Sequence, residues 1–393
     1  MKIVIITFSN TGNTQMMGKI IGEELCREGE HEVVKVDGFS LIKYFGVGGR
    51  TGSKIKSFED IDNSKKIKDM IETIKSAEVL GVGSYVYGFF PPPGVTELFD
   101  EVVLPKTLFQ KMQFFFVFSS HGSLKSPTCT ILRETIQTKN PSAIFCGSID
   151  LHCPETAVEL MAPLGHPDEW STKEIERLRE FGKTLLVSLT KKEKKTGKTI
   201  IPMKAYKVAQ STSQNIIRDI TGKLSISEDL CIGCMKCVNV CPWNAMEKKV
   251  KNVKKAPSES EKGIENKEQM ESHAIKIKDI EEYVPMCNDK ECWHCARCYN
   301  LCPKKAISFP RFNTQLRVQH SAPKLPSSYN KSENQSELSE SSSATKQSAS
   351  SSSNDLPKFV SLAHRMFIGH RGIEGFLVIL LCFTILLILK KLL

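Results

Sequence analysis

Two cysteine runs with the same spacing constrain this chain more than any other feature of its sequence. The runs CIGCMKCVNVCP and CWHCARCYNLCP both follow the pattern C-x2-C-x2-C-x3-C-P. Thiolates are soft ligands, and short spacings let one loop wrap around an iron–sulfur cluster. In this pattern three cysteines bind one cluster, and the fourth, before the proline, binds a different one. Each run therefore supplies the ligand that the other run lacks.

The crossed pattern predicts two 4Fe–4S clusters. Cluster one has the ligands Cys231, Cys234, Cys237 and Cys302. Cluster two has the ligands Cys241, Cys292, Cys295 and Cys298. Zinc sites and disulfides are the alternatives, but zinc sites usually pair two C-x2-C units across a spacer. A further cysteine close to the second run, Cys287, could be an alternative ligand, but we interpret it as a free thiol near the cluster.

The two runs together resemble a bacterial-type ferredoxin with two 4Fe–4S clusters, and we place this domain at 224–310. By this resemblance, the segments WNAM and KKAI after the two runs form short helices that close each half. A charged stretch at 247–274 separates the runs and is longer than the connection in compact ferredoxins. Its composition predicts a polar excursion between the halves.

The amino-terminal part of the chain alternates short apolar runs with helical patterns. Its first run, KIVIITF, is rich in β-branched residues, as is typical of a buried parallel strand. Strands are predicted at 2–8, 31–37, 77–86, 113–120 and 142–150, and a final amphipathic helix at 171–189. Five strands with helical crossovers predict an α/β doubly wound parallel sheet. Ligands of such sheets bind beyond the carboxyl ends of the strands.

The loop SNTGNT at 9–14 lies directly between the first strand and a helix predicted at 15–28. Backbone N–H groups and the helix dipole make such a loop an anion site, and its hydroxyl groups add donors. The loop has no lysine, whereas a nucleoside triphosphate loop would end in Gly-Lys-Ser/Thr.

This loop looks like the phosphate loop with which flavodoxins bind FMN, and the resemblance covers 1–190. It implies that the phosphate is held by Ser9, Thr11, Gly12, Asn13 and Thr14. It also implies that the flavin ring is flanked by Tyr85 and Tyr87 and contacted at its edge by Ser119, Ser120, His121 and Gly122. Tyrosines that merely pack at a strand end remain an alternative. An insertion at 39–61 departs from short flavodoxins and leaves the outer wall of the ring pocket open.

The remaining segments connect these domains to a predicted membrane anchor. A connector is expected at 191–223, and a Ser-rich disordered tether at 311–358. The apolar run at 376–389 has only fourteen residues. Flanking residues extend it to a predicted transmembrane tail anchor at 373–393. The protein is then single-pass, with its domains facing the cytosol, in a mitochondrion-type outer membrane or the endoplasmic reticulum.

Charge and composition narrow the function further. The net charge is +10, but no aromatic residues are interleaved with the lysine runs, so we expect no nucleic acid partner. The domain order resembles fused flavodoxin–ferredoxin proteins. Together with the predicted anchor, it predicts a membrane-tethered oxidoreductase that relays electrons between FMN and two clusters. Its partner would be a redox protein or a small soluble electron carrier. The alternative is an iron–sulfur carrier or sensor whose flavodoxin-like domain is an empty docking module.

Overall fold

The structure is a computed structural model that describes residues 1–27, 31–50, 65–103, 111–122, 126–153, 170–191, 203–250 and 283–309. The tether at 311–358, the tail anchor at 373–393 and the charged stretch beyond residue 250 lie outside the described residues. Within the described ranges, none of the helices is both long and apolar enough to span a bilayer.

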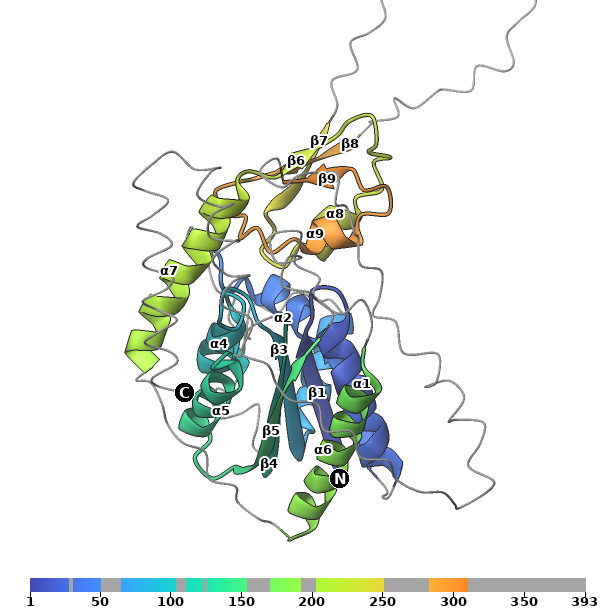
Figure 1. The fold of residues 1–393 in the computed structure, drawn as a ribbon, viewed down its shortest axis with the longest axis vertical. Coiled ribbons are helices and arrows are strands. Elements are labelled where there is room, and N and C mark those ends of the chain that lie inside the picture. Colours follow the sequence, from blue (N-terminus) through green and yellow to red (C-terminus); the bar gives the residue numbers. More distant parts are fainter. Residues whose placement is uncertain are drawn as a thin grey trace, which may run out of the picture.

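Five parallel strands form the central sheet of the larger domain (Figure 1). They are β1 (Lys2–Phe8), β2 (Glu32–Asp37), β3 (Val79–Tyr85), β4 (Phe114–His121) and β5 (Ile144–His152). Their order in the sheet is β2-β1-β3-β4-β5, which is the flavodoxin-like order with its switch point between β1 and β3. The predicted doubly wound sheet is confirmed. Strand β4 is buried along its whole length, as its apolar run predicts.

Helices cover both faces of this sheet. One face packs against α1 (Asn13–Arg27) and α6 (Thr172–Lys191). The other face packs against side chains from α2 (Gly38–Phe45), α3 (Lys65–Lys75) and α5 (Thr128–Lys139). The short α4 (Val95–Glu97) continues into the π-helix η1 (Leu98–Val103) on that second side.

Helix α2 begins one residue before the insertion at 39–61 and forms the first part of that insertion. Asp37 caps the helix by accepting the N–H of Phe39, and Gly46 ends it in the left-handed conformation. Gly38 lies so close to Phe8 that an added Cβ would come within 2.3 Å of its ring. The insertion therefore begins as a helix packed into the core, which its sequence did not indicate.

The ferredoxin-type domain contains two small antiparallel ribbons and two short helices. Strand β6 (Ser225–Ile226) pairs with β9 (Ile307–Ser308), and β7 (Met246–Val250) pairs with β8 (Tyr283–Cys287). Helices α8 (Lys236–Val240) and α9 (Arg297–Leu301) span the third cysteine of each run and end before the fourth. Two expectations were therefore wrong. The short helices precede WNAM and KKAI, and the first residues of the charged stretch at 247–274 belong to β7.

The two halves of this domain repeat the same backbone turns at equivalent places in the two cysteine runs. Left-handed φ angles occur in three equivalent pairs: Gly233 (65°) and His294 (53°), Met235 (54°) and Ala296 (61°), and Asn244 (54°) and Lys305 (53°). The halves are therefore equivalent in conformation as well as in cysteine spacing.

The ferredoxin-type domain lies over the carboxyl ends of the sheet strands (Figure 1). Helix α7 (Met203–Thr221) lies within the expected connector at 191–223 and runs beside both domains (Figure 1). Gln210 and Gln214 of α7 both donate hydrogen bonds to the carbonyl oxygen of Pro91. The connector is thus largely a helix that is fixed to the loop after β3.

Candidate redox site

The cysteines of the two runs line two separate cavities. The lining of the first cavity includes Cys231, Cys234, Cys237 and Cys302. The lining of the second includes Cys241, Cys292, Cys295 and Cys298. The structure thus brings together the two sets of four that the crossed spacing predicts. Among the described residues, no three His, Cys, Asp or Glu side chains are placed to hold a single metal ion.

Burial makes three of these cysteines, Cys237, Cys295 and Cys298, poor anions unless positive charge is bound beside them. It raises the pKa of the Cys237 thiol to about 11, and it raises the pKa of Cys295 and Cys298 as well. Low-dielectric surroundings penalise the thiolate, which is the form that binds metal. Iron would supply the compensating charge, so we expect cluster binding to release protons.

Backbone N–H groups point at the sulfur atoms in both cavities. Ala245 donates to Cys241 Sγ at 3.3 Å, and Ala306, at the equivalent position of the other half, donates to Cys302 Sγ at 3.4 Å. Hydrogen bonds to cluster sulfurs help to set the reduction potential. The two cavities thus offer the same N–H donor to the fourth cysteine of each run.

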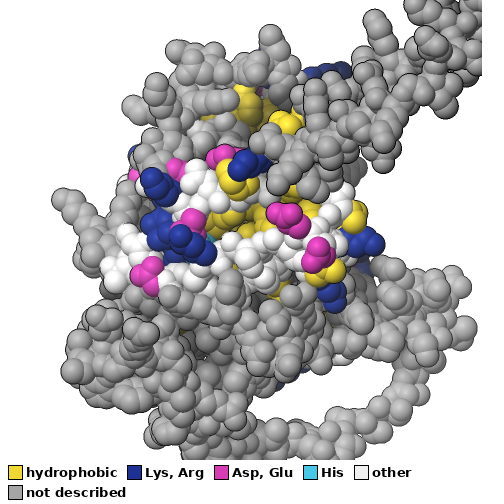
Figure 2. Space-filling view, turned by 90° about the horizontal axis from the view of Figure 1, so that it is seen from above, with side chains coloured by type: hydrophobic (Ala, Val, Ile, Leu, Met, Phe, Trp, Pro, Cys, Tyr) yellow, Lys and Arg dark blue, Asp and Glu magenta, His cyan; other side chains and the backbone are white. Residues whose placement is uncertain are grey.

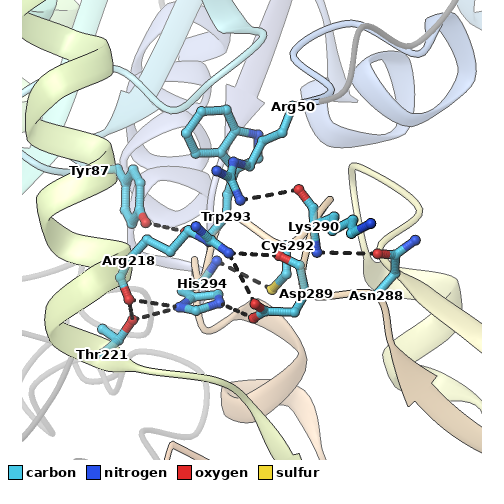
Figure 3. Close-up of polar contacts among 10 residues, drawn as sticks. All are labelled: Arg50, Tyr87, Arg218, Thr221, Asn288, Asp289, Lys290, Cys292, Trp293 and His294. Carbon is cyan, nitrogen blue, oxygen red and sulfur yellow. Dashed lines mark hydrogen bonds and ion pairs between the residues drawn. The ribbon is translucent and has the colours of Figure 1, made fainter.

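A network of polar side chains fixes the loop that forms the second cavity (Figure 3). His294 is 5% exposed; its Nε2 lies 3.1 Å from Asp289 Oδ1, and its Nδ1 lies 2.8 Å from Thr221 Oγ1. Arg218 donates to Asp289 Oδ2 at 3.0 Å. Burial lowers the pKa of His294, despite its contact with Asp289. This network connects α7 to the cluster-two cysteines, and no sequence pattern indicated it.

The predicted phosphate loop at 9–14 is buried between the end of β1 and the start of α1, and its own side chains hold its shape. The N–H of Gly12 donates to Ser9 Oγ at 3.0 Å. Thr14 Oγ1 lies 2.8 Å from Ser120 Oγ, which joins the phosphate loop to the predicted ring-edge loop. Trp170 Nε1 donates to Asn13 Oδ1 at 3.1 Å, a contact that the sequence did not indicate. Thr11, the remaining member of the set, is also buried.

The two tyrosines predicted to flank a flavin ring lie side by side at the end of β3. The ring centroids of Tyr85 and Tyr87 are 6.4 Å apart, with an edge-to-face angle of 65°. Tyr87 donates its hydroxyl to the carbonyl of Trp293, whereas the buried Tyr85 hydroxyl has no partner among the described residues. Burial raises the pKa of both tyrosines, so both hydroxyls stay protonated.

The predicted ring-edge residues at the end of β4 contact the end of β5. His121 Nε2 lies 3.4 Å from Asp150 Oδ2, and Ser119 donates its hydroxyl to the same carboxylate. The imidazole of His121 stacks on His152, and His121 Nδ1 lies 3.2 Å from the carbonyl oxygen of Gly122. The structure therefore brings the three predicted flavin segments to one edge of the sheet.

The cluster-two loop rests directly on this edge. Asn10 Nδ2 donates to the carbonyl oxygen of Cys295 at 2.5 Å. The guanidinium of Arg297 donates to the carbonyl of Ser9 and lies 4.9 Å from the centre of the Phe39 ring. The backbone of a predicted cluster ligand thus contacts the predicted phosphate loop.

Aromatic side chains and a lysine extend the contact between the two domains. Trp293 Nε1 donates to the carbonyl oxygen of Gly48 at 2.8 Å. Trp243 packs edge-on against Phe39, with ring centroids 5.9 Å apart, and joins the core of the larger domain. Lys43 donates to two carbonyl oxygens at the end of α8.

Comparisons with known proteins agree with the predicted ferredoxin-type character of the smaller domain. Residues 230–306 match the protein-family model described as a 4Fe-4S dicluster domain. The chain is also 28% identical over 81 residues to an uncharacterized polyferredoxin-like protein of Methanocaldococcus jannaschii. That match covers 20% of this chain and 36% of the relative, so the chain spans about a third of the relative's length.

Structures similar to the larger domain include a flavodoxin from the domain Archaea, at 15% identity and a TM-score of 0.30, covering 48% of this chain and 99% of that one. The rubredoxin oxygen:oxidoreductase of Desulfovibrio gigas is 14% identical with a TM-score of 0.32, covering 49% of this chain and 36% of that one. We describe the larger domain as flavodoxin-like because of its strand order.

The chain thus joins a sheet with the flavodoxin-like strand order to a segment that matches the 4Fe-4S dicluster model.

Proposed function

We propose that this protein is an oxidoreductase that relays electrons between FMN and two 4Fe–4S clusters. The observation that carries the proposal is the contact between Asn10 of the phosphate loop and the carbonyl of Cys295. A bound flavin exchanges electrons singly or in pairs, whereas each cluster carries one at a time. The protein would therefore connect a two-electron partner to a one-electron partner.

The residues at the sheet edge fit FMN. The phosphate loop lies at the switch point between β1 and β3, where flavodoxin-like sheets bind this cofactor. Three buried polar atoms at this edge have no partner among the described residues: Asn10 Oδ1, the Tyr85 hydroxyl and Arg297 Nε. A buried polar group without a partner is costly, so a polar ligand here would stabilise the site. The cation of Arg297 would also favour a phosphate.

The arrangement also supports an order for the clusters. Cluster two, held by the second run and Cys241, would lie next to the flavin, because Cys295 and Arg297 touch the phosphate loop. Cluster one would lie on the far side, where Cys234 is exposed. Electrons would then pass between flavin and cluster two, and between cluster two and cluster one.

One observation favours the second candidate, an iron–sulfur carrier with an empty docking module. The residues expected to hold flavin already contact the ferredoxin-type domain, since Tyr87 donates to Trp293 and Ser9 accepts from Arg297. In that case the sheet edge serves only to hold cluster two. Flavin content distinguishes the two candidates.

The test is anaerobic purification of the full chain, with iron, inorganic sulfide and flavin quantified together. The proposal expects FMN and two clusters per chain. The double variant Thr11→Ala with Asn13→Ala should lose flavin and keep its iron. Trp170→Phe is the control, because it removes the bond to Asn13 and leaves the loop intact. Iron without flavin in the unmodified protein would favour the empty module, and zinc in place of iron would refute both candidates.

We also propose that the segment at 373–393 anchors the protein to a membrane, with both domains facing the cytosol. Its support is the apolar run at 376–389 with flanking lysines. Deleting 373–393 should move the protein from the membrane fraction to the supernatant without changing its cluster spectra. A truncated chain that still floats with lipid vesicles would refute the anchor.

A further inference from the structure

The two halves of the ferredoxin-type domain place different side chains at equivalent positions of the cysteine pattern. In the cluster-two half, the residues Trp293, Arg297 and Trp243 all contact the flavodoxin-like domain. By spacing from the cysteines, their counterparts in the cluster-one half are Ile232, Lys236 and Lys304. One half thus uses these three positions to bind a neighbouring domain, which raises the question of what the other half binds.

The cluster-one face exposes apolar side chains. Ile232 is 60% exposed and Leu230 is 45% exposed. Five of the seven large apolar side chains that are exposed among the described residues belong to this small domain, so they are concentrated rather than scattered. Figure 2 looks down on this domain and shows hydrophobic side chains at the centre of the face, with charged side chains of both signs around them.

The charges closest to cluster one are positive. The lining of the first cavity includes Lys236 and Lys304 but no carboxylate. The nearest acidic residues in sequence, Glu228 and Asp229, precede the first cysteine and do not line the cavity. In the other half, Arg297, the counterpart of Lys236, contacts a carbonyl oxygen and lies 4.0 Å from Asp37.

We propose that the face formed by Ile232, Lys236 and Lys304 is the docking surface for a redox protein that carries carboxylates around an apolar centre. The proposal rests on the proposed function, because it requires cluster one to be present. Each transfer moves one electron between cluster one and the partner's redox centre, with no bond formed or broken. Small, weakly bound interfaces are typical of such encounters, and their charges mainly set the association rate.

The experiment measures electron transfer from the reduced full chain, freed of reductant, to two oxidised probe proteins under anaerobic stopped flow. Rubredoxin is the acidic probe and cytochrome c is the basic one. For Lys304→Glu we expect the second-order rate constant with rubredoxin to fall by roughly tenfold at low ionic strength. The rate constant with cytochrome c should rise, and both effects should fade in high salt because the charges are screened.

Matched controls come from α6 of the flavodoxin-like domain. Lys183→Glu reverses an exposed lysine there and should leave both rate constants unchanged. Ile232→Ser should lower the rate constants of electron transfer to both probes. Val187→Ser, at a side chain that is 47% exposed, should lower neither.

The results that overturn the proposal are distinct from those that overturn the proposed function. Equal rate constants for Lys304→Glu and Lys183→Glu, with cluster spectra intact, would refute the docking surface alone. A wild-type dimer that Ile232→Ser dissociates would show that a second copy occupies the face, and would also refute it. Absence of iron and sulfide before mixing would refute the proposed function and the docking surface with it.

Discussion

The two cluster cavities have the same cysteine pattern but different surroundings. The second cavity is lined by Trp243, Trp293 and Arg297, all of which bind the flavodoxin-like domain. The first cavity has Ile232 and Lys304 in its lining, and both are exposed. The cysteine spacing therefore decides which thiols lie together, whereas the residues beside the cysteines decide what each cavity contacts.

The backbone of the two halves shows the same specialisation. Gly233 and His294 occupy equivalent positions, both with left-handed φ angles. A side chain in that conformation costs on the order of 1–3 kcal/mol, whereas glycine adopts it freely. Hydrogen bonds of His294 with Thr221 and Asp289 offset this cost, and the bond with Thr221 connects the half to α7. At this pair of positions, the side chain in the left-handed conformation thus lies in the half that binds its neighbours.

The strongest test of this comparison replaces one cysteine that belongs to one run but lines the cavity of the other. Cys302 belongs to the second run but lines the first cavity. The substitution Cys302→Ser should therefore damage cluster one, and iron content should fall by up to about half, because one of two clusters loses a ligand. The measurement is iron analysis with electron paramagnetic resonance of the reduced protein.

The control is a pair of serine variants at equivalent positions. The spectrum of Cys302→Ser should match that of Cys237→Ser, which also lines the first cavity, and differ from that of Cys298→Ser, which lines the second. A match with Cys298→Ser would mean that each run binds its own cluster, and the crossed assignment would be wrong.

Both the strand order and these cysteine sets follow from short-range sequence patterns. Apolar β-branched runs such as 2–8 predict buried parallel strands, and fixed spacing determines which cysteines share a loop. The domain contact follows no such pattern, because Trp243 reaches Phe39 from about two hundred residues away in the sequence. The sequence nevertheless contained a signal that one half contacts another domain. Aromatic residues and an arginine stand in one half where the other has isoleucine and lysines.

Helix α7 could have been predicted more readily than the contact it makes. A run of helical residues ends at Gly222, whose φ of 69° and hydrogen bond to the carbonyl of Arg218 are typical of a helix end. The lysine-rich segment before it favoured the prediction of a connector at 191–223. The polar contacts of Gln210 and Gln214 with Pro91 depend on tertiary position, which composition does not encode.

A second experiment compares equivalent positions on the two faces. Trp243 is 6% exposed and packs into the core of the larger domain, whereas its counterpart Lys304 is exposed. Trp243→Ala should destabilise the protein by about 3–5 kcal/mol, as expected for a large side chain lost from a core. Lys304→Ala should change stability by less than about 0.5 kcal/mol.

Cluster loss makes unfolding irreversible, so the observable is a rate. Bleaching of cluster absorbance in guanidinium should be at least roughly tenfold faster for Trp243→Ala and unchanged for Lys304→Ala. Equal bleaching rates would mean that the contact between the domains does not stabilise the cluster-two half.

The smallest expected effect concerns Cys287, whose counterpart in the other half is Ile226. The neighbouring Cys292 raises the pKa of the Cys287 thiol, so Cys287 stays protonated and can donate to a Cys292 thiolate. A donor to a cluster ligand stabilises the more negative reduced state and raises the potential. Cys287→Ala should therefore lower the cluster-two potential by roughly 40 mV, the equivalent of about 1 kcal/mol for one electron. Redox titration followed by electron paramagnetic resonance would resolve the two clusters.

Ile226→Ala is the control and should leave the cluster-two potential unchanged, because isoleucine donates no hydrogen bond. Loss of cluster two in Cys287→Ala would instead show that Cys287 is itself a ligand.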